Sequence, residues 1–104
     1  MNEIGNPGFD DKDNRERLLI GFNFSRNLTA IAASPAPVVT VVRSEGTADA
    51  TPSAMIDGAS YIVTGGKVRQ WVIGGVAGCR YIWTCVAYGT DGQRLVLEGT
   101  MLVR

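Results

Sequence analysis

The chain has 104 residues, with ten basic side chains, ten acidic side chains and no histidine, so its formal net charge is zero. This length fits one domain, and a hydrophobic content of 45% excludes wholesale disorder. Zero net charge argues against a general nucleic-acid binder, and the lack of histidine excludes most hydrolase triads and most zinc sites.

The first 14 residues are polar and contain only two large apolar side chains, Ile4 and Phe9. They include the acidic run Asp10-Asp11-Lys12-Asp13 but neither the basic region nor the apolar stretch of a signal peptide. We predict an extended arm over residues 1–14 that lies outside the core, followed by a folded domain over residues 15–104. We also expect synthesis in a cytoplasm and no membrane partner, because no run approaches the ~18 apolar residues of a membrane span.

Short stretches with strand composition follow one another at spacings near ten residues. In chain order they are 18–24, 28–32, 38–42, 58–64, 68–73, 80–88 and 94–103. The segment Val38–Val42 is almost entirely β-branched, which is typical of a strand. No window shows a helical period with caps, so the pattern predicts an all-β domain, either a β-sandwich or a small barrel, with a loop over residues 44–57.

Glycines mark the expected turns between the last strands. Gly74, Gly75 and Gly78 separate two strand-like segments, and we expect positive φ angles there. Asp91-Gly92 is typical of a tight hairpin turn.

The segment 81–88 is apolar on both of its alternating faces. One face carries Tyr81, Trp83, Cys85 and Ala87, and the other carries Ile82, Thr84, Val86 and Tyr88. A sandwich normally buries one face of each strand and wets the other, so a second apolar face suggests packing against copies of the chain or other proteins. The alternative is that loops such as 44–57 cover these strands.

The sequence offers little chemistry. Asp11-Lys12-Asp13-Asn14-Arg15 places an arginine where a calcium loop needs an oxygen, and Gly65-Gly66-Lys67 lacks the remaining residues of a phosphate loop. Cys79 and Cys85 would lie about 20 Å apart along one strand, so we expect two free thiols. A nucleophile would lack a histidine base. We therefore expect no catalytic residue, no metal and no cofactor.

From Lys12 to Val103 the chain resembles a family of small virion proteins of tailed phages, the fibre–tail adaptors associated with the head–tail connector. The matching features are Lys12-Asp13, Glu16, the aromatic strand Gly21–Ser25, and the residues Leu28, Thr29 and Ile31. The stronger match comprises Val68, Trp71, Gly74, Gly75, Gly78, Tyr81, the strand Trp83–Val86, the turn Asp91–Arg94 and Glu98. Gln93 is an insertion in that turn, and the 46–54 loop also departs from the family pattern.

The resemblance implies an immunoglobulin-like antiparallel β-sandwich of about seven strands, present in several copies at the tail or head–tail junction of a virion. The expected partners are the chain itself in a ring-like homo-oligomer, a portal or tail protein, and a tail-fibre protein. We expect the arm and the second apolar face to carry assembly. The candidate interface residues are Phe9, Asp10, Asp11, Asp13, Trp71, Ile73 and Tyr88.

Two other functional classes stay open at this point. One is a capsid decoration protein or tail-tube component of similar fold. The other is a non-viral binding module, for example a carbohydrate-binding domain that would use Trp71 and Trp83, although few acidic residues are near them.

Overall fold

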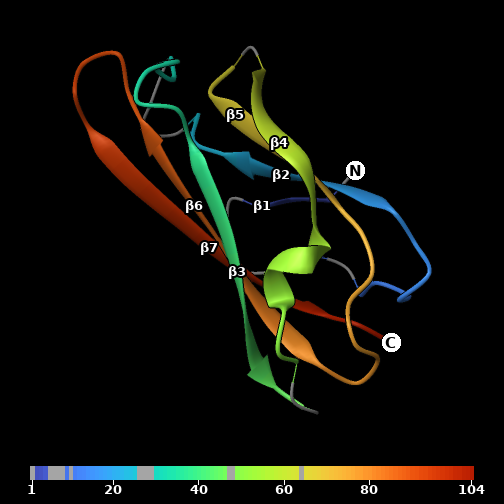
Figure 1. Ribbon diagram of the computed structural model, residues 1–104. Coiled ribbons are helices and arrows are strands. Elements are labelled where there is room, and N and C mark those ends of the chain that lie inside the picture. The colour runs from blue at the N-terminus through green and yellow to red at the C-terminus, as the bar shows by residue number, and fades with distance from the viewer. Residues whose placement is uncertain (1, 5–8, 10, 26–29, 47–48, 64) are drawn as a thin grey trace.

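The fold is given by a computed structural model that describes residues 2–4, 9, 11–25, 30–46, 49–63 and 65–104 (Figure 1). Its strands are β1 (Asn2–Ile4), β2 (Leu18–Asn23), β3 (Val38–Glu45), β4 (Ile56–Val63), β5 (Lys67–Val72), β6 (Arg80–Tyr88) and β7 (Arg94–Leu102). A short 3-10 helix, η1 (Pro52–Met55), precedes β4. The described residues form no α-helix, and the expected all-β class is confirmed.

The strands form two sheets. One sheet has the order β1-β2-β5-β4, and the other has the order β3-β6-β7. All neighbours pair antiparallel except β1, which runs parallel to β2. In Figure 1 the long strands β3, β6 and β7 run together on the left, while β4 and β5 lie on the other side of the molecule.

The core lies between the two sheets and follows from the alternation of side chains along each strand. In β6 every second residue is fully buried, namely Tyr81, Trp83, Cys85 and Ala87. The other sheet supplies Ile20, Phe22, Val68 and Val72, which are also fully buried. Burying one such side chain stabilises the fold by roughly 1.5–3 kcal/mol, so this double layer is the main source of stability. Both cysteines are buried, and they are not joined in a disulfide.

The N-terminal segment differs from the expectation that it lies outside the core. Phe9 packs against the core, and its ring meets that of Phe22 edge-on at a centroid distance of 5.7 Å. Lys12 is fully buried and forms a parallel bridge with Val103. The polar composition of the segment hid these two contacts, because Phe9 and the alkyl stem of Lys12 supply the apolar surface.

The turns agree with the glycine pattern. Gly74, Gly75, Gly78 and Gly92 all have positive φ, between +62° and +97°, as predicted. The carboxylate of Asp91 accepts hydrogen bonds from both the backbone and the side-chain nitrogen of Gln93, which closes the β6–β7 hairpin.

Two predicted boundaries shift. Residues 44–57 are not a single loop, because β3 continues to Glu45 across a bulge and β4 begins at Ile56. The predicted strand over 28–32 lies partly outside the described residues, and Ile31 makes only an isolated bridge with Gly89.

Candidate functional site

The outer face of the β3-β6-β7 sheet carries three of the exposed large hydrophobic side chains of the described residues. We call it the valine face. Its members are Val38, Thr40, Val42, Arg80, Ile82, Thr84, Val86, Tyr88, Arg94, Val96, Glu98, Thr100 and Leu102. Val38, Val42 and Val96 keep 53%, 54% and 52% of their surface exposed. Half-exposed valines at three separate points show that the flanking loops do not cover this face.

Strand register arranges the valine face in rows across the three strands. Val38, Val86 and Val96 form one row, and Thr40, Thr84 and Glu98 form the next. Val42, Ile82 and Thr100 make a third row on the far side of the threonines. The rows arise because the β-branched residues of β3 and β6 favour a pleated strand and pair directly across the sheet.

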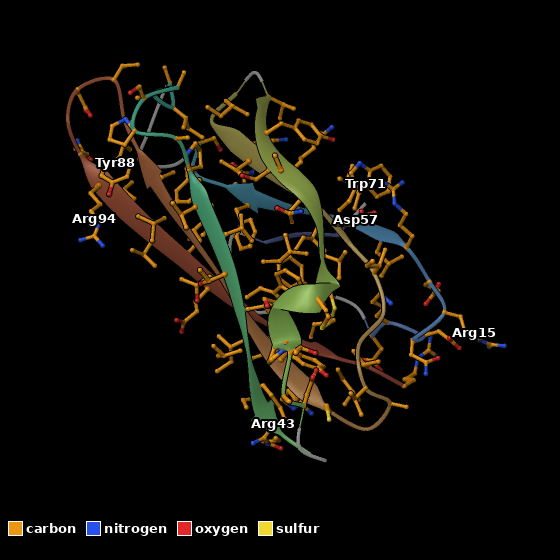
Figure 2. The ribbon with its side chains drawn as sticks, in the orientation of Figure 1. Arg15, Arg43, Asp57, Trp71, Tyr88 and Arg94 are labelled. Atoms are coloured by element: carbon orange, nitrogen blue, oxygen red, sulfur yellow. The ribbon has the colours of Figure 1, made fainter. Side chains whose placement is uncertain are left out.

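The valine face carries a few charged groups: Arg94 and Glu98 on β7, and Arg80 at the start of β6, where it is in register with Leu102 and Glu45. Glu98 accepts a hydrogen bond from the hydroxyl of Thr84 at 3.3 Å. Arg94 pairs in register with Tyr88 at one end of the sheet, and Figure 2 shows these two residues together there. Each strand is about 30 Å long and three strands span about 14 Å, so the face covers on the order of 400 Å². This area includes the threonines and charged residues of the face, and an exposed face with clustered apolar side chains is a candidate interaction site.

The outer face of the other sheet has a different character. The guanidinium carbon of Arg17 stacks 3.9 Å from the ring centre of Trp71, and its Nε donates to the Asp57 carboxylate at 2.7 Å. Figure 2 shows Trp71 and Asp57 side by side on this face. Because Arg17 covers the indole, Trp71 is not a bare apolar platform.

The structure distributes the candidate interface residues over several surfaces rather than one. Tyr88 lies on the valine face, Trp71 on the opposite sheet, and Ile73 just after β5 with 37% of its surface exposed. Phe9 is half-buried, and Asp11 is exposed. Asp10 lies outside the described residues.

Asp13 is held locally. Its carboxylate accepts hydrogen bonds from the side chain and the backbone of Arg15. The hydrogen bond from the Arg15 side chain has the largest effect in holding the pKa of Asp13 well below its usual range, and the bond from the Arg15 backbone has the next largest. Its carboxylate is therefore already occupied within the same segment.

The exposed valines of β3 and the charged residues of β7 could not be recognised as members of one surface from the sequence. In Val38–Val42 both alternating faces are valine-rich, so composition could not tell the buried face from the exposed one. The register with β6 decides this, because it places Val41 beside buried Trp83 and places Val38 beside Val86.

The buried hydroxyl of Tyr81 forms hydrogen bonds that hold two loops beside the core. The hydroxyl of Tyr81 donates to the Asp49 carboxylate at 2.7 Å and accepts from the backbone N–H of Val76 at 2.9 Å. Burial raises the pKa of Tyr81 to about 12; the bond from Val76 opposes this rise, and the bond to Asp49 adds to it.

Lys12 Nζ donates to the carbonyls of Asp13 and Gly74 at 2.9 and 2.8 Å, and burial lowers its pKa. Both Tyr81 and Lys12 are engaged in structural hydrogen bonds, so we assign them to the architecture of the loops.

Three observations bear on ligand classes. Within the described part of the chain, no group of three or more acidic, cysteine or histidine side chains is placed to hold a metal ion. Among the described residues there is no helix long and apolar enough to cross a membrane. A pocket of about 200 Å³ near Met55 and Gly75 is lined mainly by apolar and backbone groups.

No protein-family model, curated protein or solved structure matches this chain.

Proposed function

We propose that this chain is a bacteriophage virion structural protein, an adaptor that links the portal or tail to the tail fibres through protein–protein contacts between several copies. It would be made in the host cytoplasm and reside at the tail or head–tail junction. The valine face is the observation that carries the proposal. A three-stranded sheet that stays apolar on its outer side has more apolar surface than its own core needs, which suits a subunit of an assembly.

The strand order supports the immunoglobulin-like assignment that the resemblance implies. If β1 to β7 are named A to G, the two sheets have the orders A-B-E-D and C-F-G, which are those of a constant-type immunoglobulin domain. The parallel bridge between Lys12 and Val103 fits a first strand that crosses toward the last one. The parallel pairing of β1 with β2 is a departure from that fold.

The two alternatives are favoured less. A sugar-binding module would need exposed aromatic platforms, yet Trp83 is fully buried and Arg17 covers Trp71. A decoration or tail-tube protein would use similar surfaces, and it differs from an adaptor in its place and copy number in the particle.

Particle composition tests the proposal. We expect mass spectrometry of virions purified from the phage that encodes the chain to detect it, and immunogold labelling to place it at the tail or head–tail junction. The double variant Val38→Lys, Val42→Lys should fold but lose incorporation, because it puts charges on the valine face. Ala59→Lys, which adds a lysine at an exposed position of β4 in the other sheet, serves as the control. Labelling over the whole capsid would instead support a decoration protein, and absence from particles would refute all virion roles.

A further inference from the structure

The valine face carries a charge pattern that is complementary to itself. Glu98 and Arg94 lie on the same side of β7, with Val96 midway between them. Four residues of strand separate the two charged positions by about 13 Å, which is too far for a direct bond between them within one chain. A second copy of the face can bring the opposite charges together.

We propose that two copies of the chain pair face to face through the valine face, about a two-fold axis that runs across the strands along the Val38-Val86-Val96 row. Such an axis reverses the strand direction and leaves each strand over its counterpart. Val96 then meets Val96 of the second copy, and Glu98 meets Arg94 of the second copy. The two-fold symmetry creates this charge pair twice.

Electrostatics selects this axis over its neighbours. An axis along the Thr40-Thr84-Glu98 row would place two carboxylates against each other. An axis midway between the two rows would bury Glu98 against Val96 without an opposite charge, which is costly. An axis parallel to the strands would set Glu98 over Thr40. The valine row buries three apolar positions and sets Glu98 directly over Arg94, whereas an axis along the Val42-Ile82-Thr100 row would set Glu98 over Leu102, one strand away from Arg80.

The size of the face sets the strength of the pair. About 400 Å² per copy is roughly half of the ~800 Å² per partner in a standard stable interface. The pair is therefore weak for free protein and strengthened where copies are held near one another on a particle. The contact closes at two copies, so a ring of the proposed adaptor needs a second, different surface. The inference extends the proposed function, because it names the partner of the same face.

A charge swap within one chain tests the pairing. Sedimentation equilibrium, carried up to about millimolar protein, gives the dimer dissociation constant for the wild type and for variants. We expect Glu98→Arg and Arg94→Glu each to weaken the dimer at least about tenfold, because each places like charges together. The double variant should return to within about threefold of the wild type. Arg104→Glu should leave the dimer unchanged.

Cross-linking supplies an independent measurement. Cys79 and Cys85 are fully buried, so an introduced surface cysteine reacts selectively. Val96→Cys should be joined to its counterpart by a short bismaleimide, whereas Thr100→Cys, about 13 Å from the axis in each copy, should not. Equal cross-linking at both positions would overturn the axis.

Two results would overturn the pairing: a wild-type monomer at every concentration, or a double variant as weak as the single ones. A chain that is monomeric but incorporated into virions would refute the pairing and leave the proposed function intact. A chain that dimerises as described but is absent from virions would refute the proposed function and leave the pairing intact.

Discussion

At the residue scale, two glycines with almost the same backbone angle differ sharply in their surroundings. Gly46 has φ +100°, and a Cβ there would lie 2.6 Å from the carbonyl oxygen of Gly78 and 2.8 Å from the Cα of Cys79. Gly92 has φ +93°, and a Cβ there would meet nothing within 4 Å. The pair therefore separates the cost of the backbone angle from the cost of a backbone clash.

We expect Gly92→Ala to lower the free energy of unfolding by about 1–2 kcal/mol, the cost of a left-handed angle for an L residue. Gly46→Ala should lower it by at least about 2 kcal/mol more, since backbone atoms cannot move aside cheaply. Urea unfolding of the two variants and the wild type measures the difference. Equal losses would show that the chain at Gly46 relaxes away from Gly78 and Cys79.

Cys85 links the core to alkaline stability. Burial raises its pKa from 9.0 to about 12, so folding favours the neutral thiol. A raised pKa contributes stability that is complete below pH 9 and is lost as pH rises from 9 toward 12. Tyr81 acts in the same direction from about pH 10, because its pKa is also raised to about 12.

We expect Cys85→Ala to be less stable than the wild type at pH 7, because it leaves a cavity, but to lose less additional stability above pH 9. The difference in slope should approach about 1.4 kcal/mol per pH unit, the limit for one titrating group. Chemical unfolding at intervals from pH 7 to pH 11 under reducing conditions measures it. Parallel curves for the two proteins would mean that the thiol ionises equally in both states.

At the element scale, the N-terminal segment is fastened at one point to the loop between β5 and β6. The Nζ of Lys12 donates a hydrogen bond to the carbonyl of Gly74. The backbone N–H of Lys12 donates to the carbonyl of Leu102, and the carbonyl of Lys12 accepts from the backbone N–H of Arg104. The backbone bonds belong to the segment's pairing with the end of β7. The ammonium adds a link to a different loop, so one side chain joins the two chain ends to the β5–β6 connection.

We expect Lys12→Met, which keeps the buried stem, to lower the free energy of unfolding by about 1–3 kcal/mol, because the Gly74 carbonyl loses its charged donor. Hydrogen exchange should accelerate at the amides of Phe9, Lys12 and Arg104 more than at those of β6. Arg94→Met, which changes an exposed basic residue at the other end of β7, is the control. Uniform acceleration across β6 would show that Lys12 supports the whole fold and not this segment.

Most strands were predictable from the sequence, because the signals that specify them are local. β-Branched runs and glycine turns placed β2, β3, β5, β6 and β7, because these signals act within a few residues. The docking of Phe9 and Lys12 was not predictable, since it depends on Phe22 and Gly74, which are distant in sequence. The exposed side of β3 was also hidden, because only its pairing with β6 distinguishes Val41 from Val42.

At the scale of the whole molecule, the two apolar layers have different roles. The layer between the sheets holds the fold together, whereas the valine face is exposed and makes contacts outside the domain only in the proposed function. Val72 is fully buried, while Val38, Val42 and Val96 remain about half exposed. Threonine has nearly the shape and strand propensity of valine, so valine-to-threonine changes compare the two layers with little change in packing volume.

We expect the triple variant Val38→Thr, Val42→Thr, Val96→Thr to change the free energy of unfolding by less than about 1 kcal/mol, because its new hydroxyls reach water. The single variant Val72→Thr should lose about 1–3 kcal/mol, because it places a hydroxyl in the core. Urea unfolding of dilute protein measures both. The triple variant should also bind less of an apolar dye than the wild type, since it removes three methyl groups from one surface. A triple variant that unfolds as readily as Val72→Thr would assign the valine face to the stability of the single domain, which would remove the basis for a role in assembly.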